Sequence, residues 1–271
     1  MPISPWFDPW FDSALIYFYL YPMMINPETA PRTRFASIDM MRGAAILLMF
    51  IYHFSWDLTF FGYASFDLFN DPFWLIFARF IVAIILLVMG MAQIMARGRG
   101  TGLNAKVFSK RLGIILLCAA GVSGATYFVD AGSFVFFGIL HHIALASILL
   151  IGAVRLPSAA IAVLTAFCFA APWFLAHGIF SAGSLLWIGL SPVAPVSVDY
   201  VPLFPWFGIP LLGLLVGRAL VPGGTVLSWN PDHGLWHLVR CAGRHSLLLY
   251  MIHQPILFGG LYAFAFLQGR I

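Results

Sequence analysis

Seven long apolar runs dominate this sequence and leave few folds open to it. They cover residues 37–56, 73–95, 112–128, 134–154, 157–176, 203–221 and 245–268. A helix needs roughly 20 mostly apolar residues to cross the hydrocarbon layer of a bilayer. Only 9% of the 271 residues are charged and 62% are hydrophobic, whereas soluble domains carry roughly 25% charged residues. We therefore predict an all-α, polytopic integral membrane bundle of about seven transmembrane helices.

The basic residues predict the orientation of this bundle. Eleven of the fourteen lie in segments that would share one side of the membrane, namely Arg32, Arg34, Arg97, Arg99, Lys106, Lys110, Arg111, Arg155, Arg218, Arg240 and Arg244. The opposite segments hold five aspartates and one basic residue, Arg270. Because cytoplasmic loops are enriched in Lys and Arg, the N-terminus is predicted inside and the C-terminus outside. The formal charge of +4 reflects the same loops and gives no indication of nucleic-acid binding.

Two domains are expected. Residues 1–33 hold an apolar stretch, 14–25, that is too short to span a membrane, and they are interpreted as an interfacial or disordered N-terminal extension. Residues 34–271 form the transmembrane domain. The three cysteines have no paired spacing and are interpreted as packing residues, and no metal site is predicted.

The first apolar run carries a polar stripe. At about 100° per residue, Asp39, Arg42, His53 and Asp57 share one narrow helix face. Arg42 and His53 are separated by about 16 Å along the axis, so the stripe would reach from the cytoplasmic end toward the outer surface. His53 and Asp57 are four residues apart, where the carboxylate could accept a hydrogen bond from the imidazole. Such a contact fixes the tautomer and favours a general base, which makes both residues catalytic candidates.

Further polar residues are expected to form a pocket that opens outward. Arg79 lies inside the second run, and an intramembrane charge costs at least about 2.5 kcal/mol on insertion scales, so it is a functional candidate. His141, His142 and His253 would lie at similar depth, and Asp199 lies in the longest outer loop. We assign these five residues to oxyanion stabilisation or substrate binding.

A basic segment is expected at the inner surface. Arg97 and Arg99 alternate with glycines, and Lys106 follows closely. Free backbone N–H groups and positive charge suit phosphates, although a basic turn that only sets the topology explains the same pattern. Arg42 and Asp39 join this candidate binding set for a phosphate-bearing cofactor. A structural ion pair between Asp39 and Arg42 remains the alternative.

Four segments of the chain carry a resemblance to a known family. They are residues 34–49 with Asp39-Met-Met-Arg42-Gly, 137–144 with Gly-Ile-Leu-His141-His142, 199–208 with Asp199-Tyr-Val-Pro, and 245–255 with His253-Gln-Pro. In this order they resemble the heparan-α-glucosaminide N-acetyltransferase catalytic family and the related membrane acyltransferases. The resemblance covers roughly residues 34–268. The chain is shorter than the lysosomal enzymes of the family, which have several more helices and a luminal domain.

The resemblance implies transfer of an acetyl or other acyl group from cytoplasmic acyl-CoA to a hydroxyl or amine of a saccharide on the outer side. Acetyl-CoA would be a co-substrate, and the essential histidine of the family would correspond to His53. The expected partners are acyl-CoA, a saccharide or glycoconjugate acceptor and membrane lipid, with no nucleic acid. A homodimer is compatible with this reading. The expected location is the inner (plasma) membrane, as a multi-pass protein.

Two other functions fit parts of the sequence. A small-molecule transporter would also place charges inside membrane spans, although no internal repeat is seen. A b-type haem protein would use histidines within the spans, such as His53, His141, His142 and His253.

Overall fold

The fold was analysed in a computed structural model, which describes residues 36–97, 104–220 and 234–270. The chain divides into two compact units, residues 1–34 and residues 35–271. The first unit, and with it the predicted N-terminal extension, lies outside the described residues, as do Arg99 and the side chain of Arg97.

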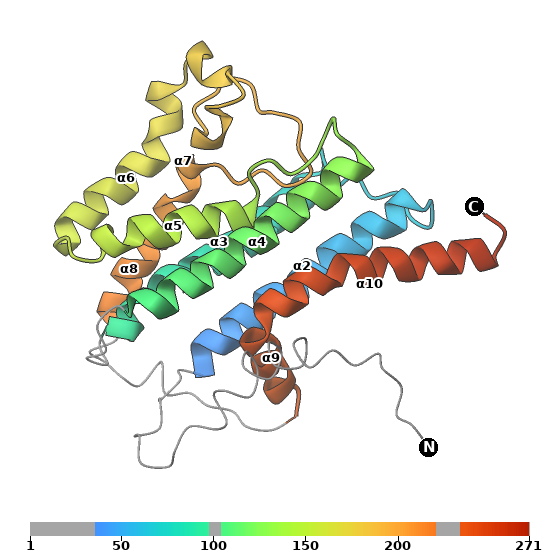
Figure 1. Cartoon of the computed structure of the whole chain (residues 1–271), viewed down its shortest axis with the longest axis horizontal. Coiled ribbons are helices and arrows are strands. Elements are labelled where there is room, and N and C mark those ends of the chain that lie inside the picture. The colour runs from blue at the N-terminus through green and yellow to red at the C-terminus, as the bar shows by residue number, and fades with distance from the viewer. Residues whose placement is uncertain (1–35, 98–103, 221–233, 271) are drawn as a thin grey trace, which may run out of the picture. The chain divides into compact units, whose positions relative to one another are not determined.

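The described part of the second unit contains helices and no strands (Figure 1). Its elements are α2 (Ala36–Phe60), α3 (Pro72–Arg97), α4 (Ala105–Val129), α5 (Ile139–Ala153), α6 (Ser158–Leu175), the 3-10 turns η1 (Gly178–Ser181) and η2 (Leu186–Ile188), α7 (Leu203–Trp206), α8 (Gly208–Leu220), α9 (Leu235–Arg244) and α10 (Ser246–Leu267). Six segments are long and apolar enough to cross a membrane, and α5 is a shorter apolar helix. The helical membrane bundle is confirmed.

The helix boundaries differ from the predicted runs in three places. Helix α4 begins at Ala105 rather than at residue 112, because the Asn104 side chain accepts hydrogen bonds from the backbone N–H groups of Lys106 and Val107 and so caps the helix. Helix α5 is shorter than its predicted run. The run 203–221 divides into α7 and α8, with non-helical backbone at Phe204.

Helix α9 was not predicted. It is amphipathic, with Leu235, Trp236 and Leu238 exposed, while Val239 and Arg240 are buried. Its polar composition kept it outside the apolar runs. With 10 residues, α9 is too short to cross a bilayer.

Glycines allow the closest helix contacts in the bundle. Gly43 of α2 faces Gly243 of α9, and a Cβ at Gly43 would overlap the carbonyl oxygen of Val239. In the same way, Gly90 of α3 lies against Pro210 and Gly213 of α8. Small residues at such crossings let helix backbones approach closely, which is how membrane helices associate. The glycine that follows Arg42 is therefore explained by packing.

Replacing Gly43 with alanine is expected to destabilise the protein by about 1–3 kcal/mol, the usual cost of overpacking. The new Cβ would meet rigid backbone atoms of α9, which cannot move as a side-chain tip can. Thermal unfolding of the purified protein measures the effect. Gly113→Ala is the matched control, because a Cβ at Gly113 in α4 meets no atom within 4 Å. Equal melting temperatures for the two variants would contradict the close α2–α9 contact.

Candidate active site in the helical bundle

Helices α2 and α10 pack side by side and run in the same direction (Figure 1). Successive residues along α2 contact successive residues along α10. The imidazole ring of His53 lies 4.6 Å from that of His253, measured between ring centroids, in an edge-to-face arrangement. One turn further along, the Gln254 side chain donates a hydrogen bond of 2.7 Å to Asp57. Two histidines, a carboxylate and an amide therefore form one polar layer between the two helices.

The tautomer of neutral His253 follows from its backbone contact. Its Nδ1 lies at hydrogen-bonding distance from the carbonyl oxygen of Tyr250. A carbonyl oxygen can only accept, so Nδ1 carries the proton and Nε2 holds a lone pair. This Nε2 is buried and has no hydrogen-bond partner among the described residues. The layer thus contains a basic nitrogen that is free to accept a proton.

Asp57 has a different partner from the one expected. It is fully buried, and its Oδ1 accepts the hydrogen bond from Gln254, while Oδ2 has no partner among the described residues. In this structure no hydrogen bond joins His53 to Asp57. Four-residue spacing on a helix permits that bond but does not require it. The carboxylate instead connects α2 with α10.

A second polar group lies where two of the sequence motifs meet. The Asp199 carboxylate accepts a hydrogen bond of 3.0 Å from the backbone N–H of Ile139, at the start of α5. A Cβ at Gly138 would overlap this carboxylate, so glycine is required there. The backbone N–H of Val201 also bonds to the carbonyl of Phe137. A helix N-terminus stabilises negative charge, and Asp199 occupies that position on α5.

The two adjacent histidines of α5 have different surroundings. His142 is fully buried, and its Nδ1 donates to the carbonyl of Val201 over 3.2 Å, which leaves Nε2 buried and without a partner in the described part of the chain. His141 accepts at Nδ1 from the backbone N–H of Gly138 and contacts the Ser123 hydroxyl through Nε2, at 3.3 Å each. His141 therefore belongs to the contact between α4 and α5.

Two tyrosines pack against the histidine pair. The ring of Tyr52 contacts that of His53, with 5.7 Å between centroids, and Tyr250 contacts His253 at 5.6 Å. Tyr250 also packs against an apolar cluster of Leu86, Ile139 and Val201. The segments 137–144, 199–208 and 245–255 thus meet beside Tyr52 and His53 of α2.

Arg79 has an exposed side chain on α3, beside the exposed Phe80, and the structure gives it no hydrogen bond or ion pair among the described residues. Its assignment to oxyanion stabilisation or substrate binding stays a prediction.

A separate charged cluster lies where the N-terminal part of α2 meets the end of α9. Arg42 pairs with Asp39 at 3.2 Å, and Arg244 of α9 reaches the other oxygen of Asp39 at 3.6 Å. The ion pair that was left open as an alternative is therefore present. Two guanidinium groups therefore reach one carboxylate. Lys106 is exposed near the start of α4.

Sequence reasoning missed several residues of the site, namely Tyr52, Tyr250, Gln254 and Arg244. Gln254 follows His253 directly in a segment that had been singled out, but a neutral amide carries no signal of its own. Tyr250 is one helical turn before His253, so their shared face could have been found from the spacing.

The fold and the polar layer identify the class of this protein. This is a multi-pass helical membrane protein with a buried histidine–carboxylate layer between two of its helices. A family model for heparan-alpha-glucosaminide N-acetyltransferase, catalytic, matches residues 34–255, and the chain belongs to this family. It is accordingly a membrane transferase of the acetyltransferase type. No curated protein and no solved structure matches the chain.

The pH dependence of stability provides a test of the Asp199 environment. Burial raises the pKa of Asp199 from 3.8 to about 6, while the hydrogen bond from Ile139 opposes the shift. The folded state then binds more protons than the unfolded state between these values, so stability falls as the pH rises from about 4 to about 6. In the Asp199→Asn variant this contribution should be missing, although the amide oxygen can still accept from Ile139. Melting curves across this range decide the matter, and parallel pH profiles for the two proteins would count against a buried, titrating Asp199.

Proposed function

We propose that this protein transfers an acetyl or other acyl group from cytoplasmic acyl-CoA to a hydroxyl or amine of a saccharide on the outer side of the membrane. The observation that carries the proposal is the histidine pair His53–His253, whose rings are 4.6 Å apart in a chain of the acetyltransferase family. The free Nε2 of His253 supplies a base that a purely structural histidine would not need.

The donor is proposed to bind at the inner ends of α2 and α9. Arg42 and Arg244 lie there around Asp39, and Lys106 is exposed near the start of α4. In the sequence, Arg97 and Arg99 come shortly before α4. Guanidinium groups bind phosphates in forked geometry, which suits the nucleotide end of acyl-CoA. The thioester end would then extend along α2 toward His53, about 16 Å from Arg42 along the helix axis.

The reaction needs one base and one electrophile. The acceptor hydroxyl or amine loses its proton to a histidine nitrogen of the pair and attacks the thioester carbonyl. The carbon–sulfur bond then breaks, and the CoA thiolate leaves and takes up a proton. A tetrahedral oxyanion forms on the way and requires hydrogen-bond donors, for which the hydroxyl groups of Tyr52 and Tyr250 are candidates. Transient acylation of His53 is the alternative route to the same products.

The product of transfer provides the direct test. Purified protein would be incubated with radiolabelled acetyl-CoA and a membrane glycan extract, and the labelled product identified. We expect label on a saccharide hydroxyl or amine. Release of acetate without any labelled acceptor, or no turnover, would contradict the proposal. A transport assay and a visible spectrum of the same preparation test the transporter and haem alternatives.

The proposed orientation has the N-terminus in the cytoplasm of a cell whose inner (plasma) membrane holds the protein. Single cysteines at Ser65 and Ala105, introduced after replacement of Cys118, Cys168 and Cys241, test it. We expect an impermeant thiol reagent to label position 65 in intact cells and position 105 only after lysis, because basic segments stay inside. Labelling of position 105 alone in intact cells would reverse the orientation.

A further inference from the structure

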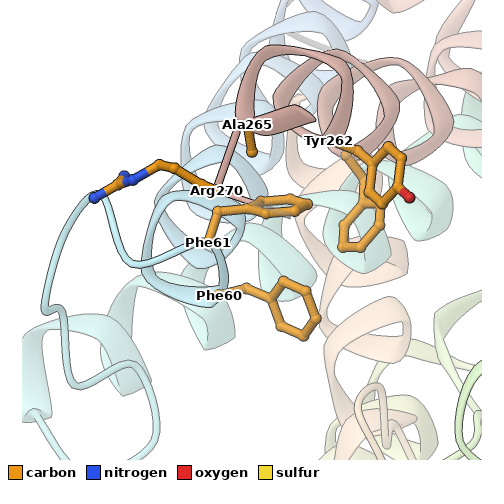
Figure 2. A pocket seen from close by; sticks show the side chains of 6 residues that line it. Phe60, Phe61, Tyr262, Ala265 and Arg270 are labelled. Carbon is orange, nitrogen blue, oxygen red and sulfur yellow. The ribbon is translucent and has the colours of Figure 1, made fainter. Parts of the chain in front are cut away.

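A groove lies between the C-terminal parts of α2 and α10 (Figure 2). These parts are remote from the charged cluster of Arg42, Asp39 and Arg244. Its volume is about 360 Å³, and it is lined by Phe60, Phe61, Phe258, Tyr262, Ala265 and Arg270. The aromatic rings contact one another, with 4.9 Å between the centroids of Phe61 and Phe258. Figure 2 shows the rings of Phe60, Phe61 and Tyr262 near one another, with Arg270 beside Phe61 and its guanidinium extending away from the rings. The groove therefore combines an apolar floor with one cation.

Arg270 is held at this rim without an anionic partner. Its guanidinium lies over the ring of Tyr63, 4.7 Å from the centroid, and the Tyr63 hydroxyl donates a hydrogen bond of 2.9 Å to Gln268. The structure gives Arg270 no carboxylate partner among the residues it describes. An arginine that lies over an aromatic ring keeps its N–H donors free for a ligand in the plane of the guanidinium.

The chemistry of the groove favours a lipid with an anionic headgroup. Phe60 and Tyr262 are 60% and 53% exposed on membrane-spanning helices, so hydrocarbon chains are their natural neighbours. Arg270 follows the end of α10, where the chain leaves the hydrocarbon layer and phosphate groups are found. A free saccharide would need several hydrogen-bonding groups, and the lining offers only the Tyr262 hydroxyl and the guanidinium.

We propose that this groove binds a lipid that carries a phosphate headgroup, with the phosphate at Arg270 and the first part of the chain against the aromatic rings. The groove begins about one helical turn beyond Asp57 and Gln254. Resting on the proposed function, the bound lipid is the anchor of the acceptor. The acceptor is then a saccharide linked to a phospholipid-type carrier.

The first experiment measures lipid binding by the purified full chain and does not depend on transfer. Phosphatidylglycerol is titrated and followed by native mass spectrometry, with diacylglycerol as a probe without phosphate and glycerol phosphate as a probe without chains. We expect phosphatidylglycerol to bind best, and Arg270→Gln to weaken its binding about tenfold. Phe258→Ala should weaken binding of both lipids. Arg155→Gln, which removes an exposed charge between α5 and α6, is the matched control and should bind as the wild type does.

Unchanged binding in Arg270→Gln, or equal losses in Arg270→Gln and Arg155→Gln, would overturn the proposed groove. Equal binding of glycerol phosphate would show a site for free phosphate instead. The second experiment extracts the product labelled from acetyl-CoA with chloroform. Label in the organic phase supports the lipid-anchored acceptor. Label found only on a water-soluble saccharide overturns the lipid-anchored acceptor and leaves the proposed function intact. Absence of any labelled product overturns the proposed function, and the lipid-binding experiment then still decides whether the groove binds lipid.

Discussion

His53→Ala is expected to lower acyl transfer by about 10²–10⁴-fold while the protein remains folded and inserted. The imidazole of His53 lies against His253 in the polar layer between α2 and α10, at the position where the stripe on α2 reaches the proposed outer half of the bundle. A general base or nucleophile contributes rate enhancement of this size, whereas a packing residue contributes stability. The measurement is acetyl transfer per correctly folded molecule, with CoA binding measured in parallel.

The control for this variant is His177→Ala. His177 is an exposed histidine before η1 whose side chain accepts one hydrogen bond, from the backbone N–H of Ile179, so loss of the imidazole should leave turnover unchanged. CoA binding to His53→Ala should also stay within a few-fold of the wild type, since the proposed nucleotide site lies near Arg42. Near-normal turnover in His53→Ala would show that the stripe on α2 is a structural polar seam.

The membrane helices were predictable because the signal for them is local. A span needs about 20 mostly apolar residues, and that requirement can be checked in the sequence alone. The run 134–154 met it but forms only the shorter helix α5. The predicted helix boundaries were wrong where tertiary or capping contacts determine them. Asn104 starts α4 early by accepting two backbone N–H bonds, and α9 is stabilised by its contact with α2 rather than by an apolar run.

The site was predictable along one helix and not between helices. The 3.6-residue period places Asp39, Arg42, His53 and Asp57 on one face of α2, and the structure gives the first two a common ion pair. The helix that packs against this face of α2 depends on the packing of the whole bundle, so it cannot be derived from the sequence of α2. The pairing of Asp57 with Gln254, and the hydrogen bond from Ile139 to Asp199, required the positions of α10 and the 199–202 segment.

His253→Asn is expected to lower acyl transfer by about 10²-fold or more if His253 accepts the proton of the acceptor. The asparagine amide can still donate to the Tyr250 carbonyl from the position of Nδ1, but it has no counterpart of Nε2. The variant therefore retains the contact that orients residue 253 and removes the buried basic nitrogen. Transfer rate and melting temperature are measured together, and only the rate should change substantially.

A double-mutant cycle with His53 completes this test. If the two histidines act as one unit, the double variant should be about as slow as His53→Ala alone, because groups that share one chemical step show grossly non-additive effects. The edge-to-face contact at 4.6 Å places them close enough for such coupling. If the rate losses of the two single variants multiply in the double variant, the two histidines act independently. His253 would then be assigned to substrate binding. Retention of wild-type turnover in His253→Asn would remove Nε2 from the reaction, since no other change in that variant could compensate for a lost base.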